Sequence, residues 1–561
     1  MKVHTHMRCS SLLKLSTVFL GLVAGPAALQ AQAPAADVIL ANGKIITVDD
    51  RFSIQQAVAV RGDRIIAVGT NQDINRLAGP NTRRIDLAGK SVAPGMIDNH
   101  AHIMEEGRIW LEELRLDGVI TRSRALDMIR AKAASLKPGQ WVYVLGGFTP
   151  DQFTDNQRDF TRAELDAVAP NNPVQLQFTR CCTYVNSKTI EVMNLEKRND
   201  PWIERDAQGH PTGVIAVEGA NAISKERPDA PKELYEAGNM ALMRDMNRAG
   251  LTTVAGPCPR EDLDAYSKWS GEGRTTVRFY CNISVPARNP MQADATIAQI
   301  PQLRKQLFQD NPYFHFYTYG EHLYQPVGDN MVAVKATAKP EDFAQWGRIA
   351  RELAKNGMPI NQHVTLTDSI NGVLDHIEQI DKEYPVRNLR WALIHLDQLD
   401  ATQLARMKKL GLYAAVQPRS TIMGGIFHRV HGASADHTPP FRMIQDSGII
   451  WGLGTDAFEV NQYRPFTTIA FAVTGKMVGG TVVNNQTISR EDALIAHTRS
   501  NAYFVSEEDN LGSIAAGKYA DLLVLDRDYL TVPADQIRDI QPVMTMVGGK
   551  VVWDATAPQN K

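Results

Sequence analysis

The sequence predicts an α/β protein: a (β/α)8 TIM-like barrel with a small composite β-sandwich domain formed by both chain ends. Three observations support this fold class. The middle of the chain alternates short apolar strands with helical stretches, which is typical of a parallel sheet. Eight such strands are present, the number that closes a barrel. Both chain ends instead show the period-two alternation and glycine-containing turns of antiparallel strands.

The predicted β-sandwich domain takes its first part from residues 34–93 and its second from residues 507–561. The first part contains "DVILANGKIITVDD" and "SIQQAVAVRGDRIIAVGT", in which Asn42–Gly43 and Gly62–Asp63 are hairpin signals. The second part contains "LLVLDRDY" and "PVMTMVGGKVVWD" with a Gly548–Gly549 turn. The simplest packing joins the two parts into one domain.

The barrel is predicted over residues 94–506. Its strands are "GMIDNHAH", "LTTVAG", "TVRFYCNI", "FHFYTYG", "PINQHV", "RWALIHLD", "LYAAVQP" and "IIWGLGTDA". Periodic helical stretches lie between several of these strands, for example residues 232–250 and 339–357. The span between the first two strands is too long for one helix, so an insertion is expected at about residues 140–230, over the barrel mouth.

The N-terminus predicts export. Lys2, Arg8 and Lys14 precede or flank the apolar run "LSTVFLGLVAGPAAL", and "AQA" offers small residues for cleavage. Residues 1–33 are therefore interpreted as a signal peptide. The alternative is a retained membrane anchor. Cleavage would leave a protein without stable membrane insertion, periplasmic or secreted.

Bulk charge excludes some partners. The chain has 60 basic and 62 acidic residues and a formal net charge of −2, so no nucleic-acid partner is expected. Cys181, Cys182, Cys258 and Cys281 lie beyond the leader. Four cysteines in a long chain are no disulfide scaffold, although an oxidising compartment would allow one bridge.

Ligand-type residues lie at the carboxyl ends of four predicted strands, where barrel enzymes carry their catalytic groups. They are His100, His102, His363, His395 and Asp456. His100 and His102 point the same way because strand side chains alternate. Imidazole and carboxylate suit a divalent ion, zinc above all. The alternatives are ordinary polar histidines at strand ends and, for Asp456, a helix cap. His428, His431 and His437 are placed in a loop over the site, solvated or touching substrate.

Motifs along nearly all of the chain resemble the amidohydrolase superfamily, within it the amidohydrolase 3 family. They include "PGMIDNHAH", "FTRAELDAVAPNNPV", "RDAQGHPTGVI", "NRAGLTTV", "GLGTDAF" and "LGSIAAGKYADLLVLDRD". The resemblance implies that the four histidines bind one or two divalent ions, with Asp456 binding metal and moving protons. His395 would alternatively orient water or substrate around a single ion.

Two departures from the family pattern bear on chemistry. Many members carry on strand four a lysine that becomes carboxylated and bridges two ions; here His315 takes that position and Tyr319 replaces an aspartate. This leaves three alternatives: one ion, another ligand from His315 or a cysteine, or a degenerate site. Cys181 stands where relatives place a pocket histidine, which predicts altered substrate recognition.

The function expected from these residues is a metal-dependent hydrolase of an amide-like, non-peptide carbon–nitrogen bond in a small organic molecule. The alternatives are a mononuclear deaminase or lactonase of the same superfamily, or a catalytically decayed ligand-binding homologue. The partner expected is a small-molecule substrate, and both a monomer and a homodimer stay open.

Overall fold

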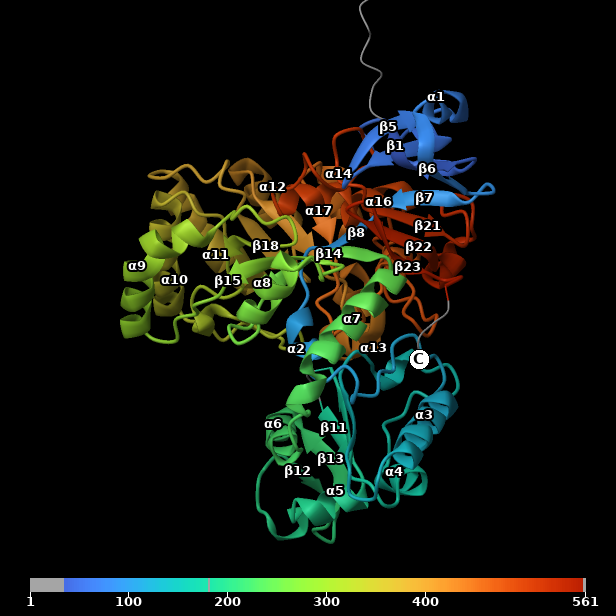
Figure 1. Ribbon diagram of the computed structural model, residues 1–561. Coiled ribbons are helices and arrows are strands. Elements are labelled where there is room, and N and C mark those ends of the chain that lie inside the picture. The colour runs from blue at the N-terminus through green and yellow to red at the C-terminus, as the bar shows by residue number, and fades with distance from the viewer. Residues whose placement is uncertain (1–34, 180–181, 558–561) are drawn as a thin grey trace, which may run out of the picture.

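The computed structural model describes residues 35–179 and 182–557 (Figure 1). The predicted signal peptide and Cys181 lie outside these ranges. The chain has a mixed α/β fold. In Figure 1 the strands from both chain ends lie at the upper right, the α/β body lies in the middle, and a further lobe lies below it.

All eight strands predicted for the α/β body are present, in two four-stranded parallel sheets. One sheet has the order β16-β15-β14-β8 and the other β17-β18-β19-β20. Their bounds are β8 Met96–Asp98, β14 Leu251–Pro257, β15 Arg278–Ile283, β16 Phe314–Tyr319, β17 Asn361–Val364, β18 Ala392–His395, β19 Tyr413–Val416 and β20 Trp451–Leu453.

Hydrogen bonds join the two sheets at both outer edges. On one side the Tyr319 amide donates to the Pro359 carbonyl at 3.1 Å, and Tyr319 bridges Ile360 in parallel. On the other side the Asp456 amide donates to the His100 carbonyl at 2.8 Å. The carboxyl ends of strands from both sheets therefore meet in one region.

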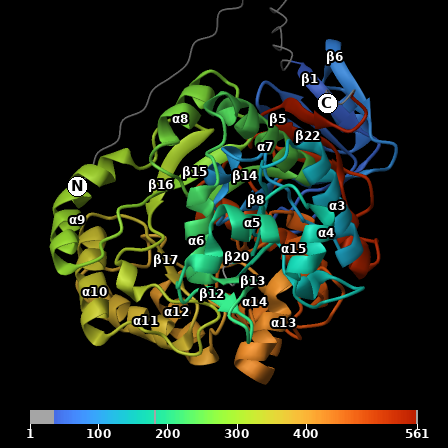
Figure 2. The same cartoon turned by 90° about the horizontal axis from the view of Figure 1, so that it is seen from below.

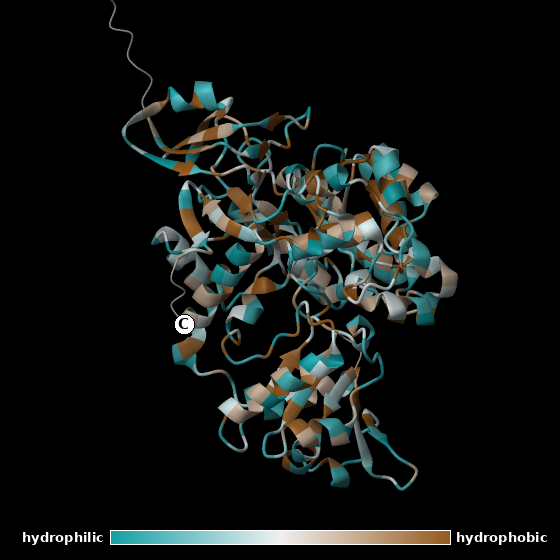
Figure 3. Cartoon of the chain, turned by 90° about the vertical axis from the view of Figure 1, so that its right-hand side faces the viewer, coloured by the Kyte–Doolittle hydropathy of each residue, from teal (hydrophilic) through white to brown (hydrophobic). Residues whose placement is uncertain are grey.

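Amphipathic helices cover the outside of these strands. In Figure 2, α8 to α12 follow one another around β14–β17. Figure 3 shows hydrophobic and hydrophilic segments alternating along the outer helices, as expected when one helix face is buried. The bounds are α7 Tyr235–Ala249, α8 Leu263–Gly271, α9 Pro290–Leu303, α10 Pro340–Lys355, α11 Thr367–Asp381, α12 Ala401–Leu410, α13 Ser420–His431, α14 Phe441–Ser447, α15 Pro465–Thr474, α16 Arg490–His497 and α17 Arg499–Phe504.

Local chemistry explains where α7 ends and where α10 begins, the two helices that cover the periodic stretches named from the sequence. Helix α7 stops at Gly250, whose φ of 98° is the left-handed conformation that ends helices, and β14 starts at the next residue. Helix α10 begins with Pro340 at its first position, where the missing amide proton costs nothing.

Strands from both chain ends share one six-stranded sheet with the order β23-β22-β21-β7-β2-β3. A second sheet, β5-β4-β1-β6, comes from the N-terminal part alone. The bounds are β1 Ala36–Ala41, β2 Lys44–Ile46, β3 Ile54–Gln55, β4 Ala57–Arg61, β5 Arg64–Gly69, β6 Ala78–Asp86, β7 Ser91–Pro94, β21 Leu522–Leu525, β22 Pro542–Val547 and β23 Lys550–Asp554; α1 is Asn71–Asn75.

Two of the three predicted hairpins are confirmed. Residues 62–63 join β4 to β5, and residues 548–549 join β22 to β23, as antiparallel neighbours. The prediction for Asn42–Gly43 is wrong, because β1 and β2 belong to different sheets. A side chain on Gly43 would lie 2.3 Å from Leu87 Cδ1. This glycine therefore serves a close packing contact where the chain passes between sheets.

The segment between β8 and β14 contains a five-stranded sheet with the order β12-β13-β11-β10-β9. It forms the lower lobe in Figure 1, together with α3 to α6. The bounds are β9 Val142–Leu145, β10 Val174–Phe178, β11 Cys182–Val185, β12 Ile203–Arg205, β13 Pro211–Ala216, α2 Ile103–Gly107, α3 Arg122–Ser135, α4 Arg162–Val168, α5 Ser187–Val192 and α6 Val217–Glu226.

Candidate metal centre

The five residues predicted as metal ligands lie together at the carboxyl ends of the parallel strands. Oδ1 of Asp456 lies 3.5 Å from Nε2 of His100 and 3.6 Å from Nε2 of His102. The ring centroids of His363 and His395 are 4.5 Å apart, and those of His100 and His395 are 5.2 Å apart. Residues that are hundreds of positions apart in sequence thus form one cluster.

The close approach of β8 and β20 brings His100 and Asp456 together. Asp98 accepts hydrogen bonds from the His100 amide at 3.1 Å and the Thr455 amide at 3.0 Å. A side chain on Gly454 would lie 2.1 Å from Asn99 Oδ1, so this contact requires glycine. The "GTD" sequence at the end of β20 therefore fixes where the Asp456 carboxylate lies.

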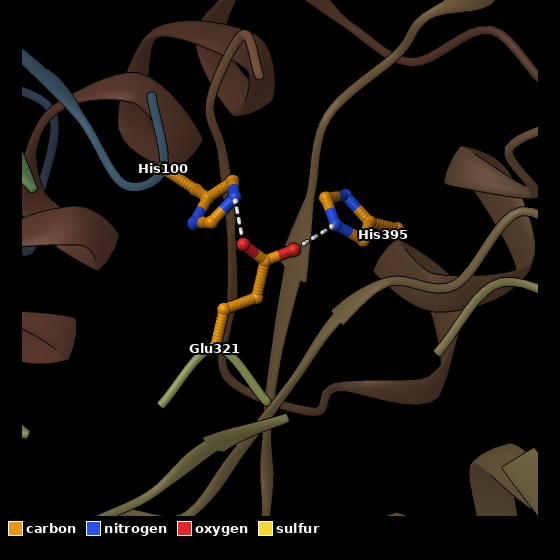
Figure 4. A group of neighbouring side chains, drawn as sticks. All are labelled: His100, Glu321 and His395. Carbon is orange, nitrogen blue, oxygen red and sulfur yellow. Dashed lines mark hydrogen bonds and ion pairs between the residues drawn. The ribbon is translucent and has the colours of Figure 1, made fainter. Parts of the chain in front are cut away.

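A sixth residue, Glu321, lies at the centre of the cluster and was not among the predicted ligands. One carboxylate oxygen, Oε1, is 2.8 Å from His363 Nδ1 and 3.4 Å from His395 Nε2. The other, Oε2, is 3.7 Å from His100 Nε2 and 3.6 Å from His102 Nε2. Figure 4 shows the carboxylate of Glu321 between His100 and His395.

Glu321 divides the cluster into two groups of donor atoms, one on each of its oxygens. The first group contains His100, His102 and Asp456, and the second contains His363 and His395. His322 also lies on the second side, with its Nε2 3.9 Å from Oε1. Two ligands at zinc–nitrogen or zinc–oxygen distance in a tetrahedron lie about 3.3 Å apart. The observed separations of 2.8 to 3.7 Å match that spacing. The donor set therefore fits divalent metal, with Glu321 presenting one oxygen to each group.

One unpaired buried nitrogen, Nε2 of His100, supports the same assignment. Both ring nitrogens of His100 and Nδ1 of His395 are buried without a hydrogen-bond partner. Buried polar atoms normally have partners, because leaving one unsatisfied is costly. Bound cations would satisfy Nε2 of His100.

Burial and charge set the protonation of these groups. Burial and the nearby Arg419 lower the pKa of His395 to about 3, so its imidazole is neutral, the form that ligates metal. Burial opposes ionisation of Glu321, but His100 and His363 hold its pKa well below the usual range. Burial likewise opposes ionisation of Asp456, and His395 and Arg419 keep its pKa below the ordinary value.

Glu321 supplies a carboxylate near strand four, where His315 replaces the lysine of many family members. His315 is not near the cluster: its Nδ1 contacts the Asn311 carbonyl at 3.0 Å, and its ring stacks on Tyr280. The structure therefore does not support His315 as a ligand. The carboxylate is supplied one residue after Gly320, beyond the strand motif "FHFYTYG". The sequence did contain a signal for Glu321. It is an acidic residue just after the carboxyl end of a parallel strand, the same end at which the other ligands lie on or after their own strands.

Cysteines take no part in the described cluster. Cys258, which follows β14, and Cys281, in β15, form a disulfide. Cys182 is in no ligand group among residues 35–179 and 182–557. His428 and His431 lie on helix α13 instead of a loop, and they do not line the cavity over the cluster.

A cavity of about 800 Å³ opens over the cluster. Its floor contains His102, Glu321, His363, His395 and Asp456. Residues absent from the prediction also line it, namely His322, Asp329, Arg419, Phe458 and Glu459. The loop at Phe458–Glu459 is held by the insertion, since the Gly147 amide donates to the Glu459 carbonyl at 2.9 Å. The insertion thus shapes one wall of the cavity.

The fold and this cluster define a class of protein: the chain belongs to the amidohydrolase family, whose model matches residues 83–553. It is 27% identical over 548 residues to N-substituted formamide deformylase of Arthrobacter pascens, covering 93% of this chain and 99% of that protein. It is 23% identical over 539 residues to a putative amidohydrolase of Bacillus subtilis (strain 168), covering 91% and 98%.

Solved structures share the fold. An uncharacterized metal-dependent hydrolase from Pyrococcus horikoshii OT3 matches with a TM-score of 0.62 and 21% identity, over 89% of this chain and 99% of that one. A mutant atrazine chlorohydrolase from Arthrobacter aurescens TC1, complexed with zinc and atraton, matches with a TM-score of 0.52 and 16% identity, over 93% and 97%.

Proposed function

We propose that the protein hydrolyses an amide-like, non-peptide carbon–nitrogen bond of a small organic molecule with the help of two divalent ions, zinc being the expected metal. The observation that carries the proposal is the position of Glu321 between two groups of ligand atoms. A catalytically decayed homologue would not be expected to keep a complete ligand set around a shared carboxylate. The Arthrobacter pascens deformylase supports the reaction class.

In this proposal His100, His102 and Asp456 would hold one ion, His363 and His395 would hold the other, and Glu321 would supply an oxygen toward each. Bound divalent ions supply an acidified water and polarise the bond under attack. Asp456 accepts the proton of the attacking water as the new carbon–oxygen bond forms. It then returns that proton to the nitrogen as the carbon–nitrogen bond breaks.

A small-molecule substrate fits the 800 Å³ cavity, which lies within the size range of small-ligand pockets. His322, Arg419 and Phe458 are the groups on this chain that would contact it. No nucleic-acid partner is proposed, and the formal net charge of −2 agrees with that. The quaternary state proposed is a monomer or homodimer.

We further propose that the two parallel sheets form one closed (β/α)8 barrel and that the two end sheets form one composite β-sandwich. The hydrogen bonds at both sheet edges support the first. The six-stranded sheet with strands from both ends supports the second. The proposed divisions are residues 34–93 and 507–561 for the sandwich and residues 94–506 for the barrel, with the insertion at about 140–230.

Export to the periplasm or beyond is also proposed. The apolar N-terminal run with its basic flank supports it, and so does the Cys258–Cys281 disulfide, since such bonds persist in oxidising compartments. Within the described part of the chain, no helix is long and apolar enough to cross a bilayer.

Metal analysis of the purified protein, combined with turnover of a panel of N-formyl and N-acyl amines, lactones and aminopurines, tests the function. Two equivalents of metal and release of amine with carboxylate are expected. Glu321→Gln should reduce both metal content and activity, because the amide offers only one ligand oxygen. Ammonia release from aminopurines would favour a deaminase. A protein that takes up less than about 0.2 equivalents of metal after reconstitution would contradict the proposal.

A further inference from the structure

His363 is held at both ring nitrogens by the segment that follows β16. Its Nδ1 lies 2.8 Å from Glu321 Oε1, as described above. Its Nε2 lies 3.0 Å from two oxygens of Asp329, the side-chain Oδ1 and the backbone carbonyl. The sequence prediction did not single out this residue. The Asp329 side chain is 1% exposed, so solvent does not compete for this contact.

The other partners of Asp329 are all donors. Oδ2 accepts from the Leu366 amide at 2.8 Å and the Thr365 amide at 3.0 Å, and Oδ1 accepts from the Thr365 hydroxyl at 2.8 Å. A protonated carboxyl group would have to direct its hydrogen against one of these donors. Asp329 is therefore a carboxylate that only accepts, and His363 Nε2 must donate to it.

With the proton on Nε2, a neutral His363 has its lone pair on Nδ1. That lone pair faces Glu321 Oε1 at 2.8 Å, where a metal ion would lie beside both atoms. Without metal, Nδ1 instead takes a second proton and donates it to Oε1, and this is the proton that a metal ion would replace. Asp329 thus leaves Nδ1 as the ligand atom.

We propose that Asp329 is a positioning residue for the metal centre: its carboxylate, together with its backbone carbonyl, holds the Nε2 proton of His363 and so leaves Nδ1 to bind metal. The inference rests on the proposed metal-dependent function. Carboxylates that accept the outer N–H of a ligand histidine typically contribute 10- to 100-fold to metal affinity. Glu321 and Asp329 lie eight positions apart on one segment, so that segment supplies both a ligand and the group that orients another.

Asp329→Asn tests the proposal because asparagine has the same shape but the opposite hydrogen-bonding at one atom. Its oxygen is expected to stay on the two backbone amides, which turns its NH₂ group toward His363 Nε2. That NH₂ group would oppose the Nε2 proton, which only the Asp329 carbonyl would then accept, so the tautomer with Nδ1 free for metal would be less favoured. We expect the dissociation constant for zinc at one of the two positions to rise by about 10- to 100-fold, measured by competition with a chelating dye.

Thr365→Val is the matched control. It removes the hydroxyl that donates to the same Asp329 oxygen and leaves the contact with His363. Its metal content and zinc affinity should match wild type, even if the melting temperature of the metal-free protein falls. The metal-free melting temperature of both variants is recorded beside the titrations.

Three results would overturn the proposal. The first is an Asp329→Asn variant that binds two ions within about threefold of the wild-type affinity, and the second is loss of metal by both variants in step with their loss of stability. The third is a wild-type protein without metal, which also contradicts the proposed function, whereas the first two leave that function intact. If Asp329→Asn does not fold, Asp329→Ala replaces it; unchanged zinc affinity in that variant would likewise overturn the proposal.

Discussion

Arg419 lies between two buried carboxylates, and its Nη1 is 3.4 Å from Oδ2 of Asp456. Its Nη2 is hydrogen-bonded to Asp397. The Arg419 and Asp397 side chains are 2% and 4% exposed. The two oxygens of Asp456 therefore face different partners: Oδ1 faces the histidine pair and Oδ2 faces a cation. Arg419 thereby holds the candidate proton carrier as a carboxylate oriented toward the ligands.

Arg419→Met should destabilise the protein by about 3–5 kcal/mol, because it leaves the buried Asp397 without its cation. The double variant Arg419→Met/Asp397→Leu should recover much of that loss, since it removes both charges, while hydrolysis stays impaired. Urea denaturation of the two variants measures this difference. Equal stability of the single and double variants would show that Asp397 does not depend on Arg419.

Asp456→Asn should reduce hydrolysis by about 10²–10⁴-fold while most of the bound metal remains, because asparagine keeps a ligand oxygen but cannot carry a proton. His100→Ala should lose both metal and activity, since His100 faces Glu321 and Asp456 together. Parallel metal and rate measurements separate the two effects. An Asp456→Asn variant with most of its activity would rule out the proton-transfer role.

The Cys258–Cys281 disulfide joins the end of β14 to β15 across a sequence separation of 23 residues. Closing a loop of that size in the unfolded chain is worth about 3 kcal/mol. Cys258→Ser/Cys281→Ser should therefore have a lower melting temperature than oxidised wild type. Reductant should lower the wild-type value toward that of the variant and leave the variant unchanged. Sensitivity of the variant to reductant would point to another redox-active group.

We expect His497 to contribute to the loss of folding stability at acid pH. It is buried below β8, where Nδ1 donates to the Ile97 carbonyl at 3.1 Å, and burial lowers its pKa from 6.5 to about 4. The unfolded chain therefore takes up a proton more readily than the folded one. The contribution of His497 to the free energy of unfolding is fully present above pH 6.5. It is lost as the pH falls from 6.5 to 4, by about 3 kcal/mol in total.

His497→Asn offers an amide donor in place of Nδ1–H and has no titrating group. Between pH 7.5 and pH 5 its free energy of unfolding should fall less than that of wild type, as followed by urea denaturation. Parallel losses in the two proteins would mean that His497 does not contribute to the acid response.

The elements that the sequence predicted best are those whose signal is local. The eight core strands were visible as short apolar runs, and α7 and α10 as helical periods with a terminal glycine or proline. The Asn42–Gly43 hairpin failed for the same reason that it was predicted: a turn signal fixes the local chain direction but not which strands pair. Pairing depends on partners far away in the sequence.

The sequence by itself determined the strands, five ligand-type residues at their ends, and the family that these motifs resemble. Only the tertiary structure decided that Glu321 places a carboxylate between the histidines while His315 lies away from the cluster. It also decided that Asp329 contacts His363 and that Arg419 contacts Asp456. The physical reason is that a residue's distance along a strand says which end it occupies. Which side chains face one another across the strand ends depends on how the two sheets meet at β16–β17 and at β20–β8.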